Sequence, residues 1–375
     1  MKQGWEIKKL GEIATYINGY AFKPEHWGED GLPIIRIQNL NNPNAEFNYC
    51  SLDVPDKYVI DNGDILISWS ASLGVYEWNQ GKAYLNQHIF KVLFNKIDIN
   101  KFFFKYAIGA KIKDMIKNAH GATMKHIVKG DFDNTPIPVP PLPVQEQIVS
   151  ELDLLSGIIE KKREQLKEFD ALAQSIFYDM FGDPITNEKG WEVKKLGEVA
   201  DIVGGSTPKT NIKEYWNGDN YWVTPAELHG TRYISSTERC ITDLAVDKAH
   251  LTQLPIGTVL LSSRAPIGKV CITRVPMYCN QGFKNIICSN KLNSEYVYQY
   301  LIDKTEFLKS LGTGATFKEI SKTTTENITI PIPPLPLQRQ FASKIEAIEK
   351  QKELIKQSIS ETETLFNARM QHYFN

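Results

Sequence analysis

The sequence lacks long apolar runs and paired cysteines. No near-continuous apolar stretch approaches the roughly 18 residues that a membrane span needs, and residues 1–10 lack the apolar core of a signal peptide. The five cysteines are odd in number, and no two are spaced as Cys-x-x-Cys, which argues against a disulfide framework and against a zinc knuckle. We therefore expect a cytoplasmic protein whose cysteines are reduced and structural.

Motifs of catalysis are also absent. The sequence has no G-x-x-x-x-G-K-[ST] phosphate loop, no G-x-G-x-x-G before a helix, no H-E-x-x-H and no G-x-S-x-G. It also lacks the Asn-Pro-Pro-aromatic tetrapeptide of amino-methylating DNA enzymes. Glu6 and Glu192 each begin a Glu-x-Lys pair like that of metal-dependent nucleases, but no acidic metal ligand precedes Glu6. We predict no catalytic residue and no metal site in this chain.

The sequence does contain a tandem repeat. Residues 4–14 read GWEIKKLGEIA and residues 190–200 read GWEVKKLGEVA. Residues 137–147 read IPVPPLPVQEQ and residues 330–340 read IPIPPLPLQRQ. Two shorter matches lie between these anchors in the same order: Asn86-Gln87 with Asn280-Gln281, and Gly121-Ala122-Thr123 with Gly314-Ala315-Thr316. Internal self-similarity of this kind predicts two copies of one structural unit.

The two copies differ most between their matching borders. Residues 24–135 and residues 210–328 change almost completely, whereas a duplication kept only for core packing would diverge evenly. This pattern indicates interchangeable modules on a constant frame. In both modules short apolar strands follow Gly turns, and helical spacing follows at residues 101–118 and 294–310, so we predict mixed α/β structure.

A long helix is predicted after each proline-rich anchor. Proline disfavours helix before it and permits helix just after it, and apolar side chains then recur every three or four residues over 144–180 and from 337 onward. A helix over residues 144–180 would be about 55 Å long. Each apolar stripe is interrupted by one lysine, Lys162 in the first and Lys352 in the second. The positions predicted for helix pairing and partner docking are Ile148, Leu152, Leu155, Ile159, Leu166, Phe341, Ile345, Ile348, Ile355 and Ile359.

The predicted organisation has four parts. Residues 1–143 and 184–336 form two globular domains, residues 144–183 form a central spacer helix, and residues 337–375 form a C-terminal spacer helix. The predicted fold class is α/β (α+β), with the two globular domains separated by two long antiparallel helices in a pseudo-twofold tandem repeat. The alternative for the helices is that each lies separately on its own domain.

Charge is segregated along the chain, although the whole is nearly neutral with 43 Lys+Arg against 44 Asp+Glu. Residues 248–294 carry basic side chains and no Asp or Glu, and residues 78–113 carry many lysines with Asp98 as the sole acid. Acidic residues concentrate in the first long helix, between residues 146 and 170. Basic segments interleaved with Tyr, Trp, Asn and Gln suit phosphate contact and base-edge hydrogen bonds, although a basic run is more often a solvated surface.

Together these features resemble the specificity (S, HsdS) subunit of type I restriction-modification systems. The resemblance covers essentially the whole chain and rests on an ordered set of motifs that occurs twice: Gly-Trp-x5-Gly-Glu, Asn-Gln, Gly-Ala-Thr and Pro-Pro-Leu-Pro-x-Gln-x-Gln. It implies that the globular parts are target recognition domains, each reading one half of a bipartite, asymmetric DNA site. Two such domains on a rigid spacer could reach half-sites about one DNA turn, roughly 34 Å, apart.

The resemblance also implies partners and cofactors. A specificity subunit has no activity of its own; it binds double-stranded DNA, docks two methyltransferase (M) subunits on its long helices and works with restriction/translocase (R) subunits. S-adenosylmethionine, ATP and Mg²⁺ would then belong to these partners, and we expect no cofactor on this chain and no membrane association. The alternatives are a specificity subunit of a modification-only methyltransferase, a scaffold that does not read DNA, and a nuclease or methyltransferase with an unrecognised site.

Candidate DNA contacts come from the basic and divergent segments, and each competes with an ordinary surface role. The residues predicted to contact bases are Arg36, Gln38 and Asn39 in the first copy and Glu227, Arg232 and Arg264 in the second. The residues predicted to contact phosphates are Lys82, Lys91, Lys125, Lys269 and Lys284. The recurring Asn-Gln pairs and Gly-Ala-Thr turns are interpreted as frame. The DNA sequence that is recognised does not follow from these residues.

Overall fold

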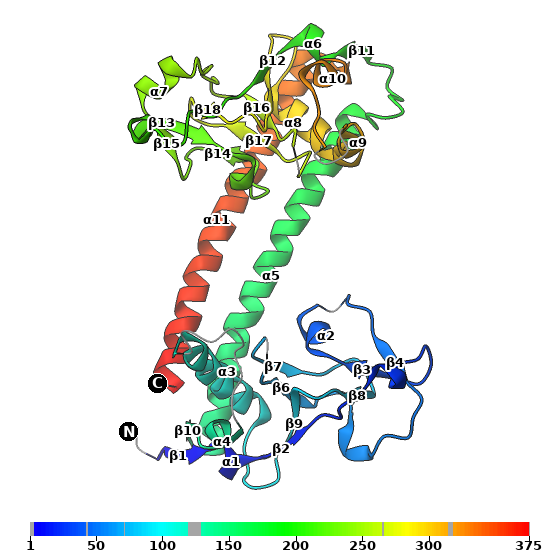
Figure 1. The fold of residues 1–375 in the computed structure, drawn as a ribbon, viewed down its shortest axis with the longest axis vertical. Coiled ribbons are helices and arrows are strands. Elements are labelled where there is room, and N and C mark those ends of the chain that lie inside the picture. The colour runs from blue at the N-terminus through cyan, green and yellow to red at the C-terminus, as the bar shows by residue number, and fades with distance from the viewer. Residues whose placement is uncertain are drawn as a thin grey trace. The chain divides into compact units, whose positions relative to one another are not determined.

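The computed structural model describes residues 4–42, 44–70, 72–118, 129–264, 266–313 and 318–374. The chain forms two compact units (Figure 1). Unit 1 comprises Met1–Arg163 and Gln357–Asn375, and unit 2 comprises Glu164–Lys356. The Gly-Ala-Thr turns and Lys125 lie outside the described residues.

Unit 1 contains two four-stranded sheets. The first is antiparallel, and its strands in spatial order are β2 (Thr15–Asn18), β9 (Ile89–Leu93), β6 (Ile65–Ser68) and β7 (Gly74–Glu77). The second has the order β4 (Asn48–Cys50), β3 (Leu32–Ile35), β8 (Ala83–Leu85) and β5 (Val59–Ile60). In this second sheet β3 runs parallel to β8, and the other pairs are antiparallel.

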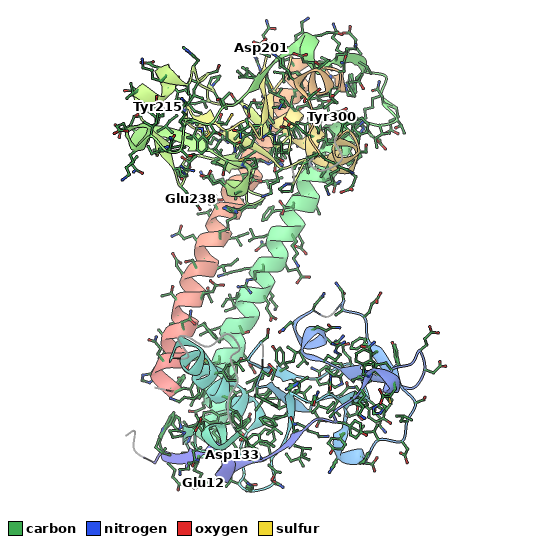
Figure 2. The ribbon with its side chains drawn as sticks, viewed as in Figure 1. Glu12, Asp133, Asp201, Tyr215, Glu238 and Tyr300 are labelled. Carbon is green, nitrogen blue, oxygen red and sulfur yellow. The ribbon has the colours of Figure 1, made fainter. Side chains whose placement is uncertain are left out.

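Helices α1, α3 and α4 pack against the first sheet of unit 1 and complete its core. The helical segments are α1 (Leu10–Ile13), η1 (Pro24–His26), α2 (Ile37–Asn41), η2 (Asp56–Tyr58), α3 (Lys101–Asn118) and α4 (Lys129–Asp133). Phe103 and Phe104 of α3 are fully buried, and Tyr16 of β2 meets Phe132 of α4 edge-on with ring centroids 4.9 Å apart. Helices α1 and α4 are in contact, with Glu12 and Asp133 on them (Figure 2).

Unit 2 repeats this arrangement. Its larger sheet has the order β12 (Ala200–Gly204), β19 (Lys284–Cys288), β16 (Val259–Leu261), β17 (Val270–Thr273) and β14 (Tyr233–Ile234). Its smaller sheet has the order β15 (Cys240–Ile241), β13 (Trp216–Val223) and β18 (Tyr278–Cys279), with β13 antiparallel to β15 and parallel to β18. The first four strands of the larger sheet match the first sheet of unit 1 in order and in antiparallel direction. The prediction of two copies of a mixed α/β unit is therefore confirmed, and strand order persists even where the sequences have diverged.

The helical segments of unit 2 also follow the order of the first copy. They are α6 (Leu196–Val199), η3 (Lys213–Tyr215), η4 (Pro225–Glu227), α7 (Asp243–Lys248), α8 (Ser294–Asp303), α9 (Thr305–Ser310) and α10 (Lys322–Glu326). Tyr215 lies beside the smaller sheet, whereas Tyr300 of α8 belongs to the main core (Figure 2). Tyr296 of α8 is buried between Phe177 and Phe181 of the first long helix.

The near-identical sequence anchors form the same two-stranded ribbon in each unit. In unit 1, β1 (Glu6–Lys9) pairs antiparallel with β10 (Pro136–Val139), and in unit 2, β11 (Glu192–Lys195) pairs with β20 (Thr329–Ile332) in the equivalent register. The glutamine that follows each ribbon is buried and makes equivalent bonds. Gln145 accepts a hydrogen bond from the backbone N–H of Asn100 and donates one to the carbonyl of Pro140. Gln338 does the same with Asn293 and Pro333, so these anchors are structural frame.

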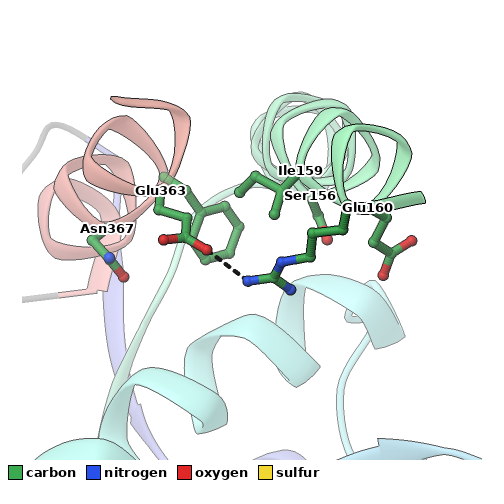
Figure 3. A pocket seen from close by; sticks show the side chains of 7 residues that line it. Ser156, Ile159, Glu160, Glu363 and Asn367 are labelled. Atoms are coloured by element: carbon green, nitrogen blue, oxygen red, sulfur yellow. Dashed lines mark hydrogen bonds and ion pairs between the residues drawn. The ribbon is translucent and has the colours of Figure 1, made fainter. Parts of the chain in front are cut away.

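Two long helices follow the ribbons, as the proline-rich anchors predict. They are α5 (Leu142–Phe181) and α11 (Leu335–Phe374), each of 40 residues, and the observed starts lie two residues before the predicted ones. Within unit 1 they run antiparallel, because Glu151 of α5 pairs with Arg369 of α11 at 2.7 Å and Arg163 of α5 pairs with Glu363 of α11 at 2.6 Å. The second pair borders a cavity of about 260 Å³ in unit 1 (Figure 3). None of the helices within the described ranges contains a stretch long and apolar enough to span a membrane.

The compact units differ from the predicted four-part division. The prediction separated each long helix from its globular neighbour at residues 143/144, 183/184 and 336/337, whereas each unit contains part of both helices. The reason is packing. In unit 1, Leu152 of α5 and Phe374 of α11 join the core built by Phe103, and in unit 2, Ala173 and Phe341 join the core of α8. The apolar stripes therefore bury themselves against the globular parts as well as against each other.

The two lysines that interrupt the apolar stripes have different environments. Lys162, in unit 1, lies 2.6 Å from Ser358 Oγ and 3.2 Å from Thr362 Oγ1, and both partners are neutral. Lys352, in unit 2, lies 2.7 Å from the carboxylate of Asp170 and 2.8 Å from that of Glu349. A buried polar residue in a helix seam fixes register at a cost in stability. For Lys352, two carboxylates offset the cost of burying the ammonium. For Lys162, the side-chain partners are neutral hydroxyls.

Exchanging each lysine for the isoleucine of the other copy should therefore act in opposite directions. Lys162→Ile is expected to raise the free energy of unfolding of unit 1 by about 1 kcal/mol, because an apolar side chain replaces a partly buried ammonium whose side-chain partners are neutral hydroxyls. Lys352→Ile is expected to lower that of unit 2, because Glu349 is buried and loses a cation. Urea unfolding with hydrogen–deuterium exchange would assign each effect to its unit, and equal effects of the two variants would contradict the argument.

Candidate nucleic-acid interface

Three segments converge at one end of the central strands β16, β17 and β19 of the main sheet in unit 2. They are the β16–β17 loop, the turn at Asn280-Gln281-Gly282, and residues 318–320. The backbone N–H of Ser263 donates to the carbonyl of Gly282, and the N–H of Ile320 donates to the carbonyl of Ser263. Asn280 and Gln281 are one of the sequence matches between the copies, so a recurring motif lies beside a divergent loop.

Unit 1 brings together the equivalent loop and turn. The backbone N–H of Trp69 donates to the carbonyl of His88, just as that of Ser263 donates to Gly282. The Trp69 and His88 rings lie 5.1 Å apart between centroids. His88 has a backbone φ of 76°, a left-handed conformation that is uncommon for residues other than glycine, although Asn, Asp and His adopt it more often than the rest. His88 stands where Gly282 stands in the second copy, but Gly282 does not have a positive φ. The two copies therefore share the hydrogen bond between loop and turn, and they differ there in side chain and in local backbone conformation.

A glycine fixes each Asn-Gln turn against the first strand of its sheet. A Cβ built on Gly19 would lie 2.1 Å from the carbonyl oxygen of Asn86, and a Cβ on Gly205 would lie 2.1 Å from that of Asn280. Contacts this short are impossible for any residue with a side chain. The interpretation of the Asn-Gln pairs as frame agrees with this geometry, whereas the Gly-Ala-Thr turns lie outside the described residues.

The unit 2 loops carry a compact group of charged side chains. Arg264 Nε lies 2.9 Å from Glu319 Oε2, and Lys284 Nζ lies 3.0 Å from Glu319 Oε1. Although partial burial raises the pKa of Glu319, the hydrogen bonds and charges of Lys284 and Arg264 outweigh that effect and hold the pKa below its ordinary value. Glu319 is therefore ionised at neutral pH, and the three side chains together carry an excess of positive charge.

Of the residues predicted to contact bases in unit 1, two remain accessible. Gln38 is exposed, and Arg36 is half-buried with its guanidinium 5.3 Å from the centre of the Trp27 ring. Asn39 is buried, accepts from the N–H of Arg36 and donates to the carbonyls of Ala45 and Glu46. Its amide is fully used within the fold, which argues against base contact by Asn39.

The lysines predicted to contact phosphates in unit 1 also divide. Lys82 is exposed. Lys91 is largely covered and bonded to Asp64 at 2.9 Å and to the carbonyl of Val59 at 2.9 Å. Lys91 therefore ties two strands of unit 1 together in this structure. The third lysine, Lys125, lies outside the described residues.

In unit 2 two predicted base contacts have structural roles instead. Glu227 caps the turn that begins at Thr224, accepting from its N–H at 2.7 Å, and its other oxygen accepts from the N–H of Glu238. Arg232 is only 7% exposed. Its guanidinium pairs with Glu295 and Glu349 and donates to Gln299. Both side chains are occupied inside the unit, which argues against direct readout by either.

The remaining three predictions in unit 2 lie at or near the converging loops. Arg264 is about half exposed. Lys284 is largely covered by its contacts with Glu319 and Ser263. Lys269 is partly buried and donates to the carbonyl of Pro225 at 3.1 Å. Arg264 is therefore the predicted residue that this site presents most openly to solvent.

The predicted helix positions mostly serve pairing and core packing. Seven of them are buried, at Ile148, Leu152, Leu155, Ile159, Phe341, Ile345 and Ile348. Three are partly exposed, at Leu166, Ile355 and Ile359. The buried positions are unavailable for docking a partner in this structure. The large hydrophobic side chains that reach solvent on the described parts of these helices are Leu142, Leu154, Leu172, Tyr178, Leu354 and Leu365.

Glu319 was not singled out from the sequence. The predictions concentrated on the basic residues 248–294, which contain no Asp or Glu, and Glu319 lies 25 residues after that range. A signal does exist in the alignment of the copies. Residues 68–74 read SWSASLG and residues 262–268 read SSRAPIG, so Ser, Ala and Gly recur at fixed places while the second and third residues differ. This pattern marks the loop that Glu319 contacts.

No metal-binding cluster is assembled in the described part of the chain. It contains no group of three His, Cys, Asp or Glu side chains that could hold a metal ion. Glu6 pairs with Lys8 at 2.8 Å, and Glu192 pairs with Lys194 at 3.1 Å, on exposed strands. All five cysteines are unpaired thiols, and burial raises the pKa of Cys271 and of Cys279 to about 12.

Comparison with known proteins supports a relationship along most of the chain. The MjaIX specificity subunit, from a type I restriction enzyme of Methanocaldococcus jannaschii, is 45% identical over 159 residues, which are 41% of this chain and 37% of that subunit. The putative MjaX specificity subunit from the same organism is 25% identical over 381 residues, covering 92% of this chain and 87% of the relative.

The fold is shared with a solved structure. The S subunit of a type I restriction-modification system from M. genitalium aligns with a TM-score of 0.60 at 14% identity, covering 99% of this chain and 96% of that one. The sequence pattern of the type I restriction modification DNA specificity domain matches residues 2–168 and again residues 188–364. Because both repeats match, this chain belongs to the type I restriction modification DNA specificity domain family.

Proposed function

We propose that this chain is the DNA-specificity subunit of a type I restriction-modification enzyme. The globular parts of unit 1 and unit 2 each read one half of a bipartite, asymmetric DNA site. One observation carries this proposal: the same hydrogen bond between loop and turn is made in both copies, with different side chains at equivalent places. Trp69 and His88 occupy in unit 1 the places of Ser263 and Gly282 in unit 2. Different side chains on one frame predict two different half-sites.

The surface chemistry of unit 2 suits a nucleic acid. Arg264 supplies half-exposed guanidinium donors, Gln281 is exposed, and the largely covered Lys284 adds positive charge. Arginine and glutamine side chains form the common base-edge contacts in the major groove, and lysines neutralise phosphates. The chain as a whole is nearly neutral, so binding depends on this local clustering.

The long helices supply docking sites for partner subunits. Leu172 of α5 in unit 2 and Leu365 of α11 in unit 1 occupy equivalent places in the two copies and are 46% and 47% exposed. Paired, equivalent apolar positions suit two copies of one partner, namely two methyltransferase (M) subunits. Methyl transfer belongs to those subunits and cleavage to restriction/translocase (R) subunits, together with S-adenosylmethionine, ATP and Mg²⁺. This chain carries no catalytic step.

The test is to express the chain with the methyltransferase encoded beside it in a methylation-free host and to map N6-methyladenine across the genome. The expected result is a split motif of two short half-sites with a fixed gap. Exchanging residues 24–135 for those of a related subunit should change one half-site and leave the other intact. The matched exchange of residues 210–328 should change only the other half-site.

Two outcomes would overturn the proposal. A soluble complex that methylates no split motif would favour a scaffold that does not read DNA. An exchange of residues 24–135 that alters both half-sites would contradict independent readout by the two units.

A further inference from the structure

The β16–β17 loop of unit 2 is a rigid frame with one variable position that faces solvent. Ser262 and Ser263 are fully buried. The hydroxyl of Ser262 donates to the carbonyl of Pro266 and accepts from the N–H of Lys269, closing the loop on itself. In unit 1 the hydroxyl of Ser68 donates in the same way to the carbonyl of Ser72. The chain is thus fixed up to Ser263, and the next side chain, Arg264, is half exposed.

Glu319 holds Arg264 by one side of its guanidinium. The bond runs from Nε to Oε2 at 2.9 Å, and short antiparallel bridges join the backbone of Glu319 to Arg264 and to Thr313. Within the described residues, neither Nη group of Arg264 has a hydrogen-bond partner. A guanidinium fixed through Nε keeps its two Nη groups available as a planar pair of donors.

Lys284 makes this arrangement stable without Arg264. Its ammonium bonds the second oxygen of Glu319 at 3.0 Å and the hydroxyl of Ser263 at 3.3 Å. Glu319 is therefore tied to β19 and to the loop by groups other than the arginine. The carboxylate of Glu319 is held in place by Lys284, and it positions Arg264 through the bond to Nε.

We propose that Arg264 reads a guanine in the half-site of unit 2 and that Glu319 is the positioning residue that aims it. The two Nη groups donate to O6 and N7 of the guanine in the major groove, the pairing that a fixed guanidinium fits best. Glu319 bonds Nε on the opposite side and limits rotation of the side chain. This inference rests on the proposed function and adds one residue, one base and one supporting carboxylate to it.

The first copy supports the assignment of Arg264 because it carries a different residue at the equivalent position. Ser70 stands where Arg264 stands in the second copy, within the same Ser-x-x-Ala-x-apolar-Gly pattern, and its side chain is 7% exposed. Unit 1 therefore offers no guanidinium at this place. A single frame with arginine in one copy and serine in the other is the arrangement expected where sequence is read.

The experiment uses the complete complex with its methyltransferase and measures methylation rates on DNA sites that differ at one base pair. Arg264→Ala should reduce discrimination at one guanine of the unit 2 half-site by about 10- to 100-fold and leave every other position unchanged. Arg264→Lys should keep overall affinity but lose the same discrimination, because an ammonium is not bidentate. Glu319→Gln should weaken discrimination several-fold at that same base, and Glu319→Asp should restore part of it.

The matched control is Arg274→Ala. Arg274 is another partly exposed arginine of unit 2, paired with Glu346 at 3.8 Å and stacked on Tyr233, away from the converging loops. It should retain the full motif. A purely structural role of Glu319 would lower the rates on all sites equally and leave base preference unchanged, which would overturn the assignment of Glu319.

The outcomes separate this inference from the proposed function. If the unaltered complex gives no split motif, the proposed function fails first. If it gives a split motif but the unit 2 half-site contains no guanine, or if Arg264→Ala and Arg264→Lys keep the original preference, the inference fails and the proposed function stands.

Discussion

Replacing Arg232 by alanine is expected to lower the free energy of unfolding of unit 2 by about 3–5 kcal/mol. Arg232 Nη1 lies 3.2 Å from Glu295, and Nε lies 3.4 Å from Glu349, both on buried acidic side chains. Its Nη2 donates to Gln299 at 2.8 Å. Removing the cation leaves two buried carboxylates without its charge, and an uncompensated buried charge is among the costliest single changes in a protein.

The pH dependence of this effect has a definite sign. Burial raises the pKa of Glu295 above its ordinary value, while the charge of Arg232 lowers it and so limits that rise. A carboxyl with a raised pKa stabilises the fold fully below its unfolded pKa and loses that contribution as pH rises through the folded value. Without Arg232 the pKa of Glu295 should rise further. The deficit of Arg232→Ala should therefore be largest near pH 8 and shrink toward pH 5.

Two further variants make the measurement specific. Arg232→Met keeps apolar volume but removes the charge, so most of the deficit should persist. Arg264→Ala removes an exposed ion pair, worth about 0–1 kcal/mol, and serves as the matched control. Urea unfolding between pH 5 and pH 8 reports all of these values. A deficit of Arg232→Ala no larger than that of Arg264→Ala, or one that grows on acidification, would contradict the argument.

The different roles of Arg232 and Arg264 could not be predicted from the sequence. Both are arginines in divergent segments, and the charge pattern along the sequence does not distinguish them. Their roles are decided by acids from distant elements: Glu295 on α8 and Glu349 on α11 bury Arg232, whereas Glu319 leaves Arg264 half exposed. Only the folded chain brings these acids within reach, so a prediction from charge patterning could not separate the two arginines.

The repeat frame was predictable because it depends on local sequence. Each proline-rich anchor forms the second strand of a ribbon and then begins a long helix, and Gln145 and Gln338 make the same bonds at the same point. Proline and buried amides act through their immediate neighbours, so equal sequence gives equal structure. The conserved strand order of the diverged segments was beyond such reasoning, since different apolar residues fill the two cores.

Replacing Gly205 by alanine is expected to destabilise unit 2 by about 3 kcal/mol or more and to abolish recognition of its half-site. The added Cβ would lie 2.1 Å from the carbonyl oxygen of Asn280 and 2.3 Å from that of Cys279. Both obstacles are backbone atoms, so the turn itself must move. That turn carries Gly282, whose carbonyl accepts the N–H of Ser263, and its displacement would shift the loop that presents Arg264.

The neighbouring glycine provides the control. A Cβ on Gly204 meets nothing within 4 Å, so Gly204→Ala should change stability by less than about 0.5 kcal/mol and keep the full methylation motif. Gly19→Ala should repeat the large effect in unit 1, because its Cβ would lie 2.1 Å from the carbonyl of Asn86. Unfolding measurements and methylation maps of the three variants test this directly, and similar values for Gly205→Ala and Gly204→Ala would refute the close approach. Each glycine supports the loop of its own unit alone. Gly205→Ala should therefore abolish recognition of the unit 2 half-site only, and Gly19→Ala recognition of the unit 1 half-site only.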